Sequence, residues 1–128
     1  MSMFDPKKPT VQLLGRWQPW HEGHTELFKR AHAKTGQVYI MIRDMPEDAD
    51  NPYSIGMRRN RIIEALREEG FTMGEDYIFS VVPNIVDITY GRNVGYSITQ
   101  EHLGEEIESI SATQIRLTMD DMEYLREP

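Results

Sequence analysis

The sequence contains no cysteine, which excludes disulfide bonds and thiolate metal sites. It also lacks an apolar run of about 18 residues that could cross a membrane, and its opening stretch, MSMFDPKKPT, lacks the apolar core of a signal peptide. A chain without cysteine suits a reducing compartment. We therefore expect a cytoplasmic protein without a membrane partner.

Positive charge is scarce: 14 Lys and Arg stand against 21 Asp and Glu, for a net charge of −7. Such a protein repels the nucleic-acid backbone as a whole, which argues against a nucleic-acid partner. The charge is unevenly spread, because residues 7–67 hold eleven basic and seven acidic side chains, and residues 68–128 hold three and thirteen. The basic half could attract a small polyanion. Uneven surface charge without a function explains the counts equally well.

The length of 128 residues fits one domain, spanning 1–128. Apolar, β-favouring runs occur at 11–15, 37–42 and 77–82, with weaker ones at 85–90 and 94–99. Helical patterns occur at 25–34, 54–69, 111–119 and 120–126. This alternation predicts an α/β fold with an open parallel sheet of about five strands and flanking helices. In such sheets ligands bind beyond the carboxyl ends of the strands, near a reversal of strand order.

The stretch GRWQPWHEGH, residues 15–24, lies where the first predicted strand gives way to a helix. His21 and His24 share one turn, and imidazoles that face an anion are expected to gain protons and donate hydrogen bonds. Gly23 allows close approach of a ligand, and a helix start offers free N–H groups. The motif predicts a phosphate site. A metal site is the rival interpretation, although no companion ligands are evident, and a structural role for the pair stays open.

A second motif, ISATQIR at residues 110–116, has the Ser-x-x-Gln pattern of a capping box and predicts a helix start at Ser111. Capping explains Ser111 and Gln114 and leaves Thr113 and Arg116 unexplained. A hydroxyl in the first turn and a guanidinium one turn later could hold the outer phosphates of a nucleoside triphosphate.

A third segment, NPYSIGMRRNRIIEAL at residues 51–66, predicts a helix with an apolar stripe of Ile55, Ile62, Ile63 and Leu66. Arg58 and Arg59 fall on the shoulders of this stripe. Of the two, Arg58 is the better candidate for a ligand contact, whereas for Arg59 a ligand contact and snorkelling over the edge of the core both stay open. The polar loop before this helix, residues 44–52, leaves the second strand on the side of the histidines and could act as a lid.

These three segments resemble known signatures. GRWQPWHEGH resembles the G-R-F-x-P-x-H-x-G-H signature of the nucleotidylyltransferase superfamily, and ISATQIR resembles its I-S-x-T-x-x-R signature. NPYSIGMRRNRI is similar to the N-P-F-T-x-x-E-R segment of archaeal-type nicotinamide mononucleotide adenylyltransferases. The resemblance covers residues 11–118. It implies a Rossmann-like, cytidylyltransferase-like domain that transfers a nucleoside monophosphate from a triphosphate to a phosphate-bearing acceptor, releasing pyrophosphate with Mg²⁺.

The resemblance also implies roles for individual residues. The catalytic set would be His21, His24 and Arg116, and the nucleotide-binding set Gly15, Arg16, Trp17, Gly23, Ser111 and Thr113. Arg43 and Arg58 would face the acceptor phosphate. No protein metal site is implied, because Mg²⁺ would be bound mainly through the triphosphate.

Two departures from these signatures leave the acceptor open. Many relatives carry a lysine after the second strand, whereas this chain has no lysine beyond Lys34, so that Arg43 is the nearest substitute. Met57 stands where the archaeal-type segment has glutamate. The aromatic-flanked RWQPWH favours ATP as the nucleotide substrate. One alternative is an enzyme that uses CTP and a glycerol-3-phosphate-type acceptor. A second alternative is a nucleotide-binding module without catalytic activity. The chain is too short for a class I aminoacyl-tRNA synthetase. The sequence leaves open whether the protein forms a homo-oligomer.

Overall fold

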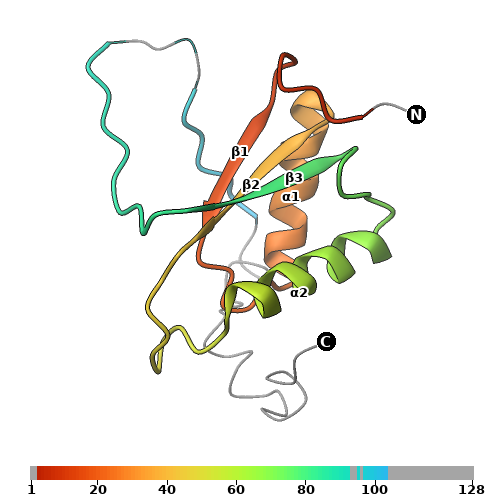
Figure 1. Ribbon diagram of the computed structural model, residues 1–128. Coiled ribbons are helices and arrows are strands. Elements are labelled where there is room, and N and C mark those ends of the chain that lie inside the picture. The colour runs from red at the N-terminus through yellow and green to blue at the C-terminus, as the bar shows by residue number, and fades with distance from the viewer. Residues whose placement is uncertain (1–2, 93–94, 96, 104–128) are drawn as a thin grey trace.

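The computed structural model describes residues 3–92, 95 and 97–103. Three strands alternate with two helices in the order β1 (Val11–Gly15), α1 (Glu22–Thr35), β2 (Val38–Arg43), α2 (Ile55–Glu68) and β3 (Tyr77–Val82) (Figure 1). All strand pairs are parallel. The predicted α/β fold with an open parallel sheet and flanking helices is confirmed. β1 and β3 have their predicted bounds, and β2 is shifted by one residue.

The weaker strand candidates are wrong where the structure describes them. Residues 85–90, 95 and 97–99 form no strand, so the described sheet has three strands, in the order β1-β2-β3 and without a reversal. Residues 83–92 continue from β3 outside the sheet (Figure 1). Further along the chain, Glu101 lies against α1, where its Oε1 is 2.9 Å from Lys34 Nζ. The helices predicted at 111–119 and 120–126 lie outside the described residues. Of the helices described, none has the length and apolar character that a membrane crossing requires.

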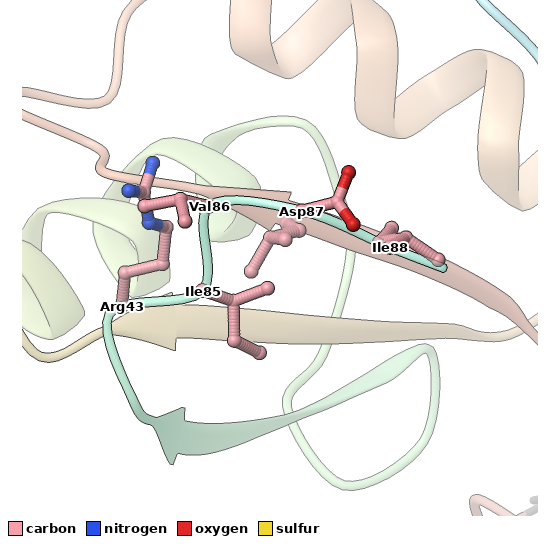
Figure 2. A pocket seen from close by; sticks show the side chains of 6 residues that line it. Arg43, Ile85, Val86, Asp87 and Ile88 are labelled. Carbon is pink, nitrogen blue, oxygen red and sulfur yellow. The ribbon is translucent and has the colours of Figure 1, made fainter. Parts of the chain in front are cut away.

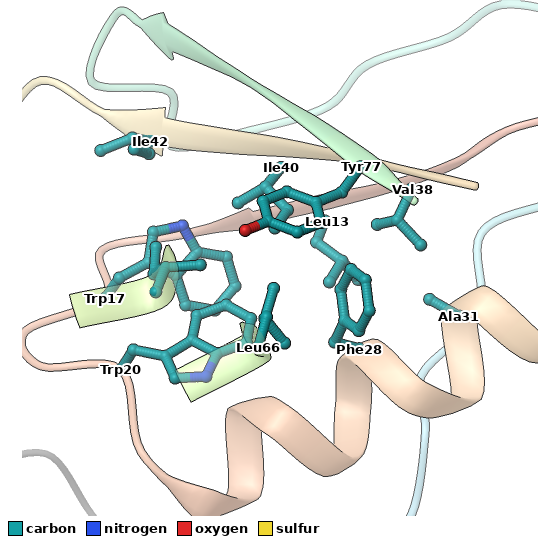
Figure 3. Packing of buried hydrophobic residues seen from close by; sticks show 11 residues of the cluster. Leu13, Trp17, Trp20, Phe28, Ala31, Val38, Ile40, Ile42, Leu66 and Tyr77 are labelled. Carbon is teal, nitrogen blue, oxygen red and sulfur yellow. The ribbon is translucent and has the colours of Figure 1, made fainter. Parts of the chain in front are cut away.

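One face of the sheet carries the core. Leu13 pairs in register with Ile40, and Val38 with Tyr77, so these side chains project from the same face. Both helices pack against this face: Phe28 and Ala31 of α1 join the same buried cluster as Ile62 and Leu66 of α2 (Figure 3). The described part of the fold therefore has two layers, with one face of the sheet left without a helix.

The helices differ from their predicted boundaries and faces. α1 begins at Glu22, three residues before the predicted start, with His21 as its N-cap. α2 begins after its N-cap Ser54, whose side chain accepts a bond from the N–H of Met57. The buried stripe of α2 is formed by Arg58, Ile62 and Leu66, at a spacing of four residues. Of the predicted stripe, Ile55 and Ile63 are only half-buried.

Candidate functional site at the carboxyl end of the sheet

The histidine turn, residues 15–24, connects β1 to α1 and folds around a tryptophan. Trp17 adopts a φ of +54°, a left-handed conformation that side chains other than glycine seldom take. Its ring is 3% exposed, and its Nε1 donates to the carbonyl of Met41 at 3.0 Å. A Cβ on Gly15 would lie 2.8 Å from this ring, so glycine is required there. Gly15 and Trp17 support the turn, and their predicted contact with a nucleotide stays a prediction.

The two histidines cap α1 with their rings. His21 Nδ1 accepts a hydrogen bond from the N–H of Gly23, and His24 Nδ1 accepts one from the N–H of His21, both at 3.1 Å. This reciprocal arrangement is a capping box in which imidazoles replace the usual hydroxyl and carboxyl groups. The early helix start follows from it. The sequence contains this capping box as a His-x-x-His pattern. Histidine is not among the residues preferred at helix N-caps, so the pattern did not predict the helix start.

The same bonds fix the tautomer of both rings. A neutral imidazole that accepts at Nδ1 carries its proton on Nε2. The capping box thus leaves each histidine with one N–H donor, at Nε2. Neither ring needs a positive charge to donate.

The surroundings of the histidines keep them neutral. The rings of His21 and His24 stack with centroids 3.7 Å apart, and Trp17 and Trp20 lie 4.9 and 5.5 Å from His24. Burial, and then the charge of His21, lowers the pKa of His24 to about 3, and burial lowers the pKa of His21. Both imidazoles are therefore neutral in the free protein, and their gain of protons against a bound anion stays a prediction. The turn presents two neutral donors.

The segment that precedes α2 is fastened to the histidine turn. Gln18 is 2% exposed and makes two hydrogen bonds to the backbone of Tyr53. Its Oε1 accepts from the N–H of Tyr53 at 3.1 Å, and its Nε2 donates to the carbonyl of Tyr53 at 3.3 Å. Arg16 Nη1 donates to Asn51 Oδ1 at 3.2 Å. Asn51 also bonds to Asp48, and this hydrogen bond lowers the pKa of the Asp48 carboxyl. The loop at 44–52 therefore lies beside the turn, where a lid was expected.

Arg58 occupies an unexpected place. It is 1% exposed, and its Nη1 donates to the carbonyls of Arg16 and Arg43 at 2.8 and 2.9 Å. The sequence predicted a cation that faces the acceptor phosphate, whereas the guanidinium lies inside the protein and binds backbone. Arg59 is exposed and lies over the Phe79 ring at 5.7 Å, as expected for a snorkelling side chain.

Arg43 lies at the same end of the sheet as the histidine turn but faces the other way. It alternates along β2 with the buried Ile42, so its side chain lies on the face without helices. Its Nη2 donates to Asn84 Oδ1 at 2.7 Å. It lines an open hollow of about 470 Å³ with Leu14, Ile85, Val86, Asp87 and Ile88 (Figure 2).

The structure brings together the members of the predicted site that lie in the turn, namely Gly15, Arg16, Trp17, His21, Gly23 and His24. Ser111, Thr113 and Arg116 lie outside the described residues. Within the described part of the chain, no three His, Asp or Glu side chains gather as a metal site would require.

The chain is similar to archaeal enzymes of one name. A nicotinamide-nucleotide adenylyltransferase of Methanococcus aeolicus is 27% identical over 81% of this chain and 73% of its own length. Proteins of the same name from Pyrococcus horikoshii and Methanococcus maripaludis are 25% and 30% identical, over 84% and 61% of this chain and 70% and 43% of their own lengths. No protein-family model matches the chain. The relatives confirm the predicted resemblance to nucleotidylyltransferases.

Proposed function

We propose that this protein is an enzyme that transfers the adenylyl group of ATP to a phosphate-bearing small molecule and releases pyrophosphate. The observation that carries the proposal is that His21 and His24 both accept backbone N–H groups at Nδ1, which leaves the Nε2–H of each ring as a donor at the start of α1. The shared name of the relatives supports ATP over CTP, and nicotinamide mononucleotide as the acceptor to test first.

The reaction needs alignment and charge stabilisation rather than a protein nucleophile. An oxygen of the acceptor phosphate attacks the α-phosphorus of ATP, and the bond from that phosphorus to the oxygen bridging to the β-phosphate breaks. The negative charge grows on oxygens that preorganised N–H donors can stabilise. His21 and His24 supply two such donors, and the positive end of the α1 dipole favours anions at the same place.

The remaining groups divide between the two substrates. We assign Arg16, in the histidine turn, to the triphosphate, and we keep the assignment of Ser111, Thr113 and Arg116 to its outer phosphates. The hollow beside Arg43 opens on the face of the sheet without helices, so an acceptor bound there would reach the histidine turn around the carboxyl end of β2. Its apolar walls would pack against a flat ring, and the guanidinium of Arg43 would bind phosphate beside the carboxylate of Asp87. Magnesium would arrive bound to the triphosphate, since the described residues offer no carboxylate cluster for it.

A substrate panel tests this function. ATP and CTP are each combined with nicotinamide mononucleotide and with glycerol 3-phosphate, in the presence of Mg²⁺, and pyrophosphate release is measured. We expect turnover with ATP and nicotinamide mononucleotide. Turnover with CTP and glycerol 3-phosphate alone would replace the adenylyl assignment. A rise in melting temperature with ATP, without pyrophosphate from any pair, would identify a nucleotide-binding module instead.

A further inference from the structure

The buried guanidinium of Arg58 joins three pieces of backbone. Its Nη1 donates to the carbonyl of Arg16, which follows β1, and to that of Arg43, which ends β2. Its Nε donates to the carbonyl of Ser54, the N-cap of α2, at 3.4 Å. A charge in the interior is tolerated only where hydrogen bonds compensate its lost hydration, so these bonds hold the side chain in place.

The two carbonyls on Nη1 belong to the two halves of the proposed site. Arg16 is the second residue of the histidine turn, and Arg43 lines the hollow. One nitrogen therefore sets the distance between the backbone that carries the donors and the backbone that carries the acceptor-side arginine. We propose that Arg58 is a positioning residue, which holds the histidine turn and the end of β2 at the spacing that in-line transfer requires. This inference rests on the proposed function.

An apolar side chain could fill the space of Arg58 but could not make these bonds. The two carbonyls would lose their donor, and the ends of β1 and β2 could separate. Lysine is shorter and carries its donors on one atom, so it cannot reproduce the fork that binds Arg16, Arg43 and Ser54 together. Misplacement by about 1 Å is enough to slow a reaction about 100-fold.

The chain provides an optical reporter for the position of the turn. Its only two tryptophans, Trp17 and Trp20, both lie in the histidine turn and are 3% and 1% exposed. Quenching of their fluorescence by acrylamide measures how tightly the turn is held, in the free protein and without any reaction. We expect the quenching constant of Arg58→Ala to at least about double, with far-UV circular dichroism unchanged.

Arg59→Ala is the matched control, since it removes the same charge from the neighbouring position on α2, where the side chain is exposed. In the panel assay we expect kcat of Arg58→Ala to fall about 100-fold. KM of this variant for ATP should change little. Millimolar methylguanidinium should restore part of its kcat and part of the protection of its tryptophans from acrylamide quenching. Arg59→Ala should match the wild type in both measurements.

The outcomes distinguish a role of Arg58 in positioning the histidine turn from a role in stability alone. A folded Arg58→Ala with a lower melting temperature, but with wild-type quenching and kcat, would overturn the proposal. If Arg58→Ala does not fold, Arg58→Lys decides: raised quenching with a lowered kcat supports positioning, and wild-type values of both overturn it. A wild type that is inactive on the whole panel would defeat the proposed function, and the quenching of the variants would still decide whether Arg58 holds the turn.

Discussion

The imidazole rings of His21 and His24 stack at 3.7 Å, and each ring accepts a backbone N–H at its Nδ1. One arrangement therefore does two things. It caps α1, and it aims the remaining proton of each ring away from the backbone, at Nε2. Helix start and phosphate donors are built from the same two side chains, so their effects on stability and on turnover should be linked.

Replacement of His24 by alanine should affect both properties. We expect kcat to fall about 100- to 1000-fold, which is typical for the loss of one preorganised donor. The melting temperature should also fall, by the equivalent of up to about 1 kcal/mol, because one of the two reciprocal bonds of the capping box is lost while His21 still caps α1. The control is His32→Ala, at the other end of α1, where the ring pairs with Asp76 at 2.9 Å. Wild-type kcat in His24→Ala would remove this residue from the mechanism.

Stability should depend on pH through His24. Its pKa is about 3 in the folded protein and 6.5 in the unfolded chain, so between these values the unfolded state binds more protons. The contribution is complete above pH 6.5 and is lost as the pH falls toward 3. The slope for one proton is at most about 1.4 kcal/mol per pH unit. Urea unfolding from pH 8 to pH 4 measures it, and a His24→Ala curve with the wild-type slope would contradict the assignment.

Gly15 should not tolerate a larger side chain. The Cβ of an alanine would lie 2.8 Å from the ring of Trp17, which is held by its bond to Met41. We expect Gly15→Ala to lower the free energy of unfolding by about 1–3 kcal/mol, as overpacking does, and to shift tryptophan emission to the red. Gly91→Ala is the control, because nothing lies within 4 Å of the added atom. Equal stabilities of the two variants would refute the packing explanation.

Gln18 should stabilise the junction between the turn and α2. Alanine there removes both bonds to the backbone of Tyr53 in a buried place, and we expect a loss of about 2 kcal/mol in the free energy of unfolding. Gln12→Ala, on an exposed site of β1, should cost little. Chemical denaturation of the two variants measures the difference, and a cost below that of Gln12→Ala would speak against the junction.

Arg43 should serve the acceptor and not ATP. We expect Arg43→Met to raise KM for nicotinamide mononucleotide about tenfold or more, the cost of one charged hydrogen bond, and to leave KM for ATP nearly unchanged. Arg67→Met, on an exposed position of α2, is the charge-matched control. A rise in KM for ATP alone would move Arg43 from the acceptor side to the nucleotide side.

The sequence by itself determined the elements whose signal is local. The apolar runs of β1 and β3 have the bounds that their residues predicted, and the histidine motif lies at the predicted junction of strand and helix. Alternating apolar residues and glycine-containing turns depend on neighbours in the chain, so they can be read without knowledge of the fold. The resemblance to nucleotidylyltransferases was readable for the same reason.

Only the tertiary structure decided what depends on distant neighbours. The weak strand at 85–90 forms no ladder, since β pairing needs a partner and not only a pattern. His24 is neutral because Trp17, Trp20 and His21 surround it, although free histidine titrates near neutrality. Arg58 turned inward because the ends of β1 and β2 bring two carbonyls within its reach. Burial and charge are properties of the folded surroundings, which no single stretch of sequence contains.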